Sequence, residues 1–261
     1  MSSTAFKQLK KQISAIERSS LVKKDDVRFS TGSDALDLVF PAGAINSGAL
    51  LEVLPDNYRQ RCAATGATLA LGARLLREKT GPLIWCQLRD PERLHLHAPG
   101  LAAFGIDPER IIKLTLKSEH DLLWAMEEAL NCSYLSGVVG VLWHEKLYNF
   151  TASRRLSLRA KESGVSALML RSHRANGTTA ADMRLSVRTR ESSAMPERAA
   201  FLPRLGKTAW QLDLKKCRGA NSGSWHIGWN RETISFDLAS RLVGGTSLPE
   251  IPVREDKRHI G

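Results

Sequence analysis

ALLEVL (residues 49–54) and the PDNYRQRCAATGAT that follows it (residues 55–68) decide the fold of this chain. The apolar run predicts a buried strand, and a helix is expected after it at Thr65–Lys79. In a nucleotide-binding α/β protein, a glycine-rich loop ending in Gly-Lys-Thr or Gly-Lys-Ser joins such a strand to its helix, and its lysine binds phosphate. No lysine occurs here between Lys24 and Lys79. We therefore expect the strand–loop–helix unit to be kept without its phosphate-binding lysine.

Four more apolar strands follow this unit and alternate with amphipathic helices. The strands are predicted at Leu83–Cys86, Ile111–Leu116, Val138–Trp143 and Val165–Leu170. The further helices are predicted at Ala98–Phe104, after a capping box of Ser118 and Asp121, and at Ser153–Glu162. Continuous apolar strands separated by helices are typical of a parallel sheet covered on both faces. The sequence therefore predicts an α/β fold with a mainly parallel sheet.

The pattern changes after Arg171, where four segments alternate between apolar and polar residues. They are Met183–Arg190, Ala209–Lys215, Ser224–Trp229 and Thr233–Phe236. Such alternation predicts strands with one covered face, and we expect them to be antiparallel strands at the C-terminal side of the sheet.

The two ends of the chain are expected to lie outside this core. Phe6, Leu9, Ile13 and Ile16 recur at helical spacing within Thr4–Arg18 and form an apolar stripe. A charged linker separates this helix from the core, so we predict that the stripe binds a partner protein. We expect an N-terminal helix and linker at 1–28, a core at 29–240 that opens with a short helix at Ser33–Phe40, and a flexible tail at 241–261.

The charge of the chain is concentrated in one segment. The net charge is +11, and residues 151–218 hold 15 Lys and Arg against 5 Asp and Glu, a net charge of +10. A basic surface attracts the phosphates of nucleic acid and releases their counterions. The alternative is a solvated basic surface that only aids solubility.

The remaining composition excludes several classes of protein. The start of the chain lacks the apolar core of a secretory signal, and no stretch is apolar over the length that spans a bilayer. The four cysteines are widely spaced, which argues against a disulfide framework or a zinc site. We expect a cytoplasmic protein without a metal or cofactor.

Several of these features resemble RecA over most of the chain. An amphipathic helix and linker precede Ser30-Thr31-Gly32-Ser33, and Ala181–Arg188 is similar to the strand after the second DNA-contacting loop of RecA. Within this class two segments resemble the inducible-mutagenesis protein A (ImuA) family: Ala63-Ala64 before an Ala/Leu-rich helix, and Leu214–Gly219 followed by Trp225–Trp229. The resemblance implies a RecA-like fold and a role beside an error-prone translesion polymerase, with RecA as a further partner.

The resemblance also lets the catalytic positions be tested one at a time. Gly66, Ala67 and Thr68 correspond to a Gly-Lys-Thr relic, with Ala67 where lysine belongs. Gln87 stands near the position of the glutamate that orients the attacking water, and glutamine cannot take a proton. Leu142–Trp143 ends the strand where an aspartate should help to bind magnesium. We therefore expect a degenerate nucleotide site and no enzymatic activity, and we ask whether Arg59 or Arg61 replaces the lysine.

The basic segment supplies the predicted contacts with single-stranded DNA. The segment after the fifth strand corresponds to a RecA region that grips DNA, and basic residues continue into the later strands. The predicted DNA-binding residues are Arg171, His173, Arg174, Arg184, Arg188, Lys215, Lys216 and Arg218. Single-strand binding usually adds aromatic stacking to charge, but Phe201 is the only aromatic residue between Thr151 and Pro203. We therefore expect weak binding through phosphates.

Two other functions remain open at this stage. One is an ATP-dependent recombinase of the RecA type, against which the missing lysine is the strongest argument. The other is a cell-division inhibitor of the SOS response with a related fold. The favoured function is a non-catalytic accessory factor of DNA-damage-induced mutagenic translesion synthesis.

Overall fold

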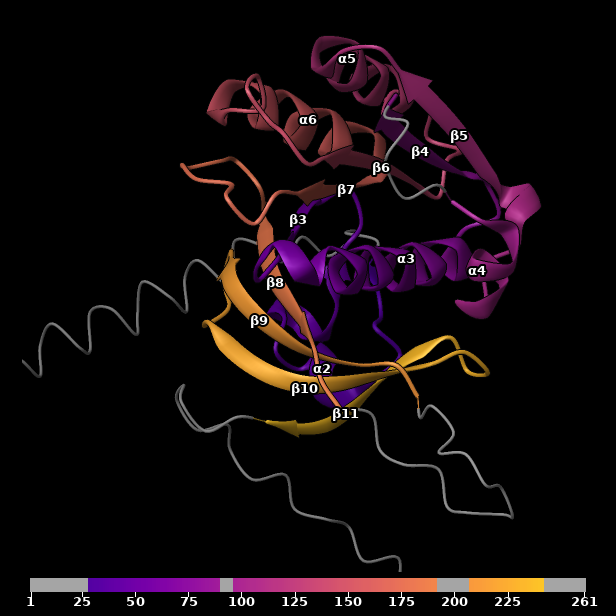
Figure 1. The fold of residues 1–261 in the computed structure, drawn as a ribbon, viewed down its shortest axis with the longest axis vertical. Coiled ribbons are helices and arrows are strands. Elements are labelled where there is room, and N and C mark those ends of the chain that lie inside the picture. The colour runs from indigo at the N-terminus through magenta and orange to yellow at the C-terminus, as the bar shows by residue number, and fades with distance from the viewer. Residues whose placement is uncertain (1–27, 90–95, 192–206, 242–261) are drawn as a thin grey trace, which may run out of the picture.

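The computed structural model describes residues 28–89, 96–191 and 207–241 (Figure 1). Its strands are β1 (Arg28–Phe29), β2 (Ile45–Asn46), β3 (Leu50–Pro55), β4 (Leu83–Leu88), β5 (Ile111–Leu116), β6 (Gly137–Leu142), β7 (Ser166–Arg171), β8 (Met183–Thr189), β9 (Ala209–Cys217), β10 (Gly223–Asn230) and β11 (Ser235–Arg241). Nine of them form one sheet in the order β11-β10-β9-β8-β3-β7-β6-β4-β5, and β1 pairs with β2 separately. The predicted N-terminal helix with its stripe Phe6, Leu9, Ile13 and Ile16, and the predicted tail, lie outside the described residues.

Six neighbouring strands of the large sheet, β3 to β8, run parallel to one another. Every residue of β6 and β7 is buried, as expected for central strands covered on both faces. The strands β9, β10 and β11 complete the sheet with antiparallel pairings on the C-terminal side. The predicted α/β class, a mainly parallel sheet with antiparallel strands at its C-terminal side, is confirmed.

The predicted antiparallel strand at β8 is confirmed on one side only. Strand β8 pairs antiparallel with β9, but it runs parallel to β3, with Met183 opposite Leu51 and Val187 opposite Pro55. The alternation in Met183–Arg190 reflects that one face of β8 is more exposed than the other. It does not indicate whether the strand runs parallel or antiparallel to its neighbours. The chain between β7 and β8 reverses twice, so both strands end at the same edge of the sheet.

The helices cover the two faces of the sheet (Figure 1). They are α2 (Asp34–Asp37), α3 (Arg61–Glu78), α4 (Ala98–Ala103), α5 (Glu119–Ala129) and α6 (Phe150–Ser163), with 3₁₀ turns η1 (Pro41–Gly43), η2 (Tyr58–Gln60) and η3 (Pro108–Arg110). One apolar cluster lies on the α3 face and includes the inward residues of β9 to β11, and a second lies beneath α5 and α6. In the part of the chain that the structure describes, no helix is long and apolar enough to cross a membrane.

Local capping explains where the helices begin. The Ser118 hydroxyl accepts from the Asp121 N–H at 3.1 Å, which confirms Ser118 as the N-cap of α5. Asn149 accepts from the Ala152 N–H at 3.1 Å, so α6 begins at Phe150 and not at Ser153. The short helix expected at 33–40 is confined to α2 and is followed by η1.

Helix α3 begins at Arg61, four residues before the predicted start at Thr65. It therefore absorbs most of the loop that stands where a phosphate-binding loop was sought. Gly66 allows this helix to pack closely, since a Cβ atom there would lie 3.0 Å from Trp210 and 3.2 Å from Phe104. The glycine serves close helix–sheet packing inside the helix.

Candidate functional site

The carboxyl edge of the parallel strands is the place where ligands bind in open α/β sheets. The loop after β3 crosses this edge as the turn η2, whose Arg59 N–H donates to the Asn57 side chain at 3.0 Å. Gln60 Oε1 accepts from the Thr189 N–H and hydroxyl at 2.8 and 2.9 Å, at the end of β8. These bonds hold the loop against the sheet edge.

The predicted Gly-Lys-Thr relic lies elsewhere, within the second turn of α3. Ala67 is 1% exposed, and the Thr68 hydroxyl donates to the Ala64 carbonyl at 2.8 Å. A phosphate-binding loop needs free backbone N–H groups at the start of its helix, whereas these residues have helical backbone. Placing Gly66, Ala67 and Thr68 at a degenerate phosphate loop was wrong, because the helix starts earlier than its sequence suggested.

Side chains fill the space where α3 begins. The guanidinium carbon of Arg61 lies 4.2 Å from the ring centroid of Tyr58 and 4.9 Å from that of Trp143, which follows β6. The Tyr58 ring also meets the His173 ring edge to face, with centroids 6.2 Å apart. We name these four residues, Trp143, Arg61, Tyr58 and His173, the edge stack. The edge stack puts bulky side chains where a phosphate loop requires small residues.

A buried charge network lies on the sheet face beneath α6, next to the same edge. Glu52, in the middle of β3, is fully buried, and its Oε2 accepts from Arg171 Nη1 at 3.0 Å and from Arg184 Nε at 2.7 Å. The Tyr148 hydroxyl donates to Glu52 Oε1 at 2.9 Å. Arg171 also donates to both carboxylate oxygens of Glu145, at 2.8 and 3.0 Å. Each charge in this network therefore has a partner.

The network keeps Glu52 ionised and the Tyr148 phenol neutral. Burial alone would raise the pKa of Glu52, but the charges of Arg171 and Arg184 outweigh it and lower that pKa below its ordinary value. Burial, together with the charge of Glu52, raises the pKa of Tyr148 well above its ordinary value. A general base needs a pKa near the working pH, so this carboxylate is an ion-pair partner rather than a base.

Two further residues at positions that a nucleotide site would use bind other side chains of the protein. Gln87 is 8% exposed on β4, and its side-chain oxygen accepts from the Trp85 indole N–H at 3.1 Å. Glu145, the first carboxylate after β6, is bound to Arg171.

The predicted DNA-binding residues fall into three groups in the structure. Arg171 is 1% exposed and ion-paired, so its prediction as a DNA contact is wrong. Arg184 is half-buried, and its guanidinium donates to Glu52, Thr179 and the Gly177 carbonyl. His173 and Arg188 are also half-buried, and the exposed members are Arg174, Lys215, Lys216 and Arg218. Sequence could not separate these groups because all of them are basic residues in one charged segment.

The accessible basic residues lie around two edges of the sheet. Arg174 follows the end of β7, and Arg188 lies near the end of β8. Arg188 and Lys216 lie on the sheet face opposite α3. Lys216 is opposite Arg184 in the register, and Arg184 shares its face of β8 with Arg188, whereas the alternate residues of β8 pack toward α3. Lys216 donates to the Thr179 carbonyl at 2.9 Å. Arg188 therefore lies at the carboxyl end of this face and Lys216 at its other end, with Asp213 between them in the register.

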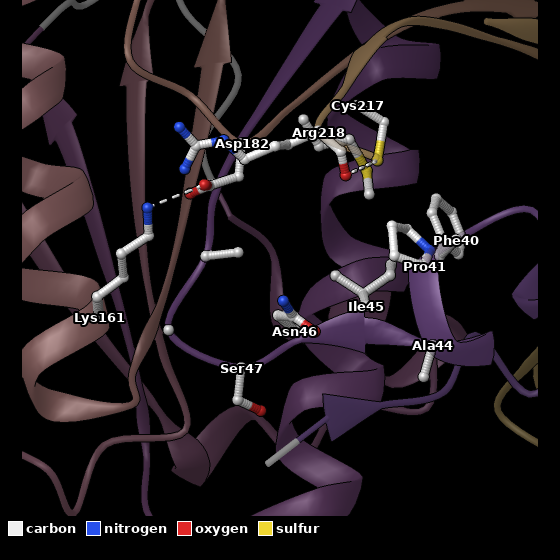
Figure 2. A pocket seen from close by; sticks show the side chains of 13 residues that line it. Phe40, Pro41, Ala44, Ile45, Asn46, Ser47, Lys161, Asp182, Cys217 and Arg218 are labelled. Atoms are coloured by element: carbon white, nitrogen blue, oxygen red, sulfur yellow. Dashed lines mark hydrogen bonds and ion pairs between the residues drawn. The ribbon is translucent and has the colours of Figure 1, made fainter. Parts of the chain in front are cut away.

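Arg218 belongs to a cavity of about 350 Å³ at the opposite edge of the sheet (Figure 2). Figure 2 shows Lys161, Asp182 and Arg218 on one side of it and Phe40, Pro41 and Ile45 on the other. The Lys161 ammonium lies 3.1 Å from the Asp182 carboxylate, so these two charges offset each other.

Cys217 also lines this cavity. Burial and the charge of Asp182 raise the pKa of its thiol to about 11, which keeps the thiol protonated at neutral pH. The cavity therefore has mixed polar and apolar walls without an activated nucleophile among its described lining residues.

Comparison with known proteins agrees with the resemblance seen in the sequence. No protein-family model matches the chain. Two proteins named Protein ImuA, from Caulobacter vibrioides strains NA1000 / CB15N and ATCC 19089 / CIP 103742 / CB 15, are each 27% identical to it over 246 residues. The alignments cover 89% of this chain and 95% of each relative. The chain is a homologue of ImuA.

The similarity to ImuA extends over most of the described fold, since only about a tenth of the chain lies outside the alignment. The predicted resemblance to the ImuA family is thereby confirmed. The roles of single residues at the sheet edge rest on the geometry described above.

Proposed function

We propose that this ImuA homologue is a non-catalytic accessory factor of DNA-damage-induced mutagenic translesion synthesis. In this role it binds single-stranded DNA weakly, and its protein partners are the error-prone polymerase complex and RecA. The ImuA similarity supports the process, and the sheet edge supports the absence of catalysis. Phe6, Leu9, Ile13 and Ile16 remain the predicted partner-binding residues.

The edge stack is the observation that carries the non-catalytic part of the proposal. Arg61 is held between two rings, and its Nε is buried without a hydrogen-bond partner among the described residues. The loop is also tied to Thr189. A nucleoside triphosphate would have to displace the side chains of Tyr58 and Arg61 to reach the backbone at the start of α3. The nearby carboxylates of Glu52 and Glu145 are already paired with arginines.

We therefore expect no saturable binding of a fluorescent ATP analogue with magnesium, measured by fluorescence anisotropy. Replacing Arg61 with lysine, the residue of a phosphate loop, should not create binding, because the loop remains bulky and tied to β8. Arg59→Lys, in the same turn, is the matched control. Micromolar binding by the native protein that Arg61→Ala abolishes would contradict the proposal, because it would mean that Arg61 replaces the missing lysine.

The exposed basic surface supports the nucleic-acid part of the proposal. At the carboxyl edge, Arg174 is exposed and Arg188 is half-buried. Among the described residues, neither arginine has an acidic partner. Arginines without carboxylate partners are available to phosphate oxygens. Phosphate contacts give affinity without sequence preference, and that affinity depends on salt.

The double variant Arg174→Ala with Arg188→Ala should weaken single-stranded DNA binding equally for all sequences. Losing two phosphate contacts should reduce the slope of log K against log salt by about 1.4. Lys113→Ala with Lys117→Ala removes the same charge near β5, at the far edge of the sheet, and should leave the slope unchanged. Anisotropy titrations at several salt concentrations measure both slopes. An unchanged slope for the arginine pair would remove this surface from the proposal.

A further inference from the structure

The part of the basic segment that ends with β8 lacks aromatic side chains, but the structure brings one to it from a distant part of the chain. No Phe, Trp or Tyr occurs from Thr151 to Glu191. Tyr58, in the turn after β3, lies against His173, which follows β7. Its side chain is 61% exposed, among the most exposed of the large apolar and aromatic residues in the described structure. An exposed aromatic ring is therefore present beside the part of the basic segment that has none of its own.

The Tyr58 ring is oriented by its neighbours rather than free. The Arg61 guanidinium carbon lies 4.2 Å from the centroid of the Tyr58 ring. The same carbon lies 4.9 Å from the centroid of the Trp143 ring. The turn that carries the ring is fixed by Asn57 and by the bonds between Gln60 and Thr189. A ring that is already held loses little conformational entropy when a flat ligand stacks on it.

Exposed charged residues are sequence neighbours of the two rings, and they include one acid, Asp56, two residues before Tyr58. Arg59, on the same turn, and Arg174, one residue after His173, are both exposed. His173 Nδ1 and Arg61 Nε are buried and have no hydrogen-bond partner among the described residues. An exposed aromatic face with cations on neighbouring residues is the combination that binds a base and its flanking phosphates.

We infer that Tyr58 is a stacking platform for a base of single-stranded nucleic acid, with Arg59 and Arg174 binding the adjacent phosphates. The inference rests on the proposed function and adds the class of ligand and the residue that selects it. A duplex has both faces of each base covered by its neighbours, so a stacking platform favours a single strand. The turn that replaces a phosphate-binding loop would thus bind nucleic acid.

The test compares two probes of equal length and charge, a fluorescent oligothymidylate and an abasic oligomer without bases. The native protein should bind oligothymidylate about tenfold more tightly than the abasic oligomer, as expected for one stacked base. Tyr58→Ala should bind both probes alike, at the affinity that the native protein has for the abasic one. Tyr58→Phe keeps the ring and should remain within about twofold of the native affinity for oligothymidylate.

The outcomes separate this inference from the proposed function. Equal binding of both probes by the native protein would overturn the stacking role and leave phosphate binding intact. An unchanged preference in Tyr58→Ala would also overturn it. Failure of the native protein to bind either probe would overturn both proposals. Unchanged thermal unfolding of the two variants, expected because Tyr58 is exposed, ensures that a loss of binding reports on the ring.

Discussion

Arg171→Ala is expected to lower the free energy of unfolding by about 3–5 kcal/mol, because it leaves a buried carboxylate short of its cation. Arg171 is the residue that joins Glu52 to Glu145, and it is 1% exposed. After its removal Glu52 retains Arg184, the Tyr148 hydroxyl and the Thr179 side chain as partners. Chemical denaturation followed by tryptophan fluorescence measures the loss.

Arg174→Ala is the matched control for this variant, since Arg174 is an exposed arginine in the same segment. It should change the stability by less than about 0.5 kcal/mol, as is usual for an exposed position. The two variants should also differ in function, because Arg174 is a proposed phosphate contact and Arg171 is not. A stable Arg171→Ala protein that has lost DNA affinity would restore Arg171 as a DNA contact and contradict the structure.

The same network should make stability depend on acid. The folded-state pKa of Glu52 is lowered from 4.5, so its ionisation stabilises the fold at higher pH. That contribution is lost as the pH falls below 4.5 and through the folded-state value. Glu52→Gln should therefore remove part of the decline in stability between neutral and acidic pH. An unchanged acid dependence in Glu52→Gln would show that other carboxylates account for it.

Arg74→Ala is expected to cost about 3 kcal/mol, because it deprives two carbonyl groups of a charged donor. Arg74 is 5% exposed on α3, and it donates to the Ser30 carbonyl at 2.6 Å and to the Ile234 carbonyl at 2.9 Å. It thereby joins α3 to the segment after β1 and to the turn between β10 and β11. Equilibrium denaturation measures the change.

Arg77→Ala is the control on the same helix. Arg77 is exposed and donates to the Thr233 carbonyl at 2.7 Å in the same turn. Because that bond is open to solvent, its loss should cost much less than the loss of Arg74. Equal costs for the two substitutions would mean that Arg74 has no special role in holding the C-terminal strands.

Sequence patterns predicted the elements of this fold better than they predicted its site. The range predicted for β5 agrees with the structure, and β3 and β6 differ by one residue at each end, because continuous apolar runs leave little choice of register. The parallel pairing of β8 with β3 was missed because alternation reflects burial alone. The start of α3 was missed because Gln60, the residue before the helix, makes no side-chain capping bond and gave no start signal.

The side-chain contacts of the site could not be predicted, because the residues that contact one another come from distant segments of the chain. Glu52 is a lone acid in an apolar strand, and this signal could have indicated a buried cation nearby. It could not indicate Arg171 among the many arginines of the basic segment. Likewise, Trp143 is far from Tyr58 and Arg61 in sequence, and the sheet order brings it to Arg61.

The central claim is that the carboxyl edge of this sheet binds nucleic acid and not a nucleotide. Photo-crosslinking of an iodouracil-substituted single strand, followed by peptide mapping in the presence and absence of excess ATP with magnesium, tests it most directly. The account predicts crosslinks in the peptides that contain Tyr58 or His173, with a yield that excess ATP leaves unchanged. Crosslinks confined to other parts of the chain, or a yield that ATP abolishes, would contradict it.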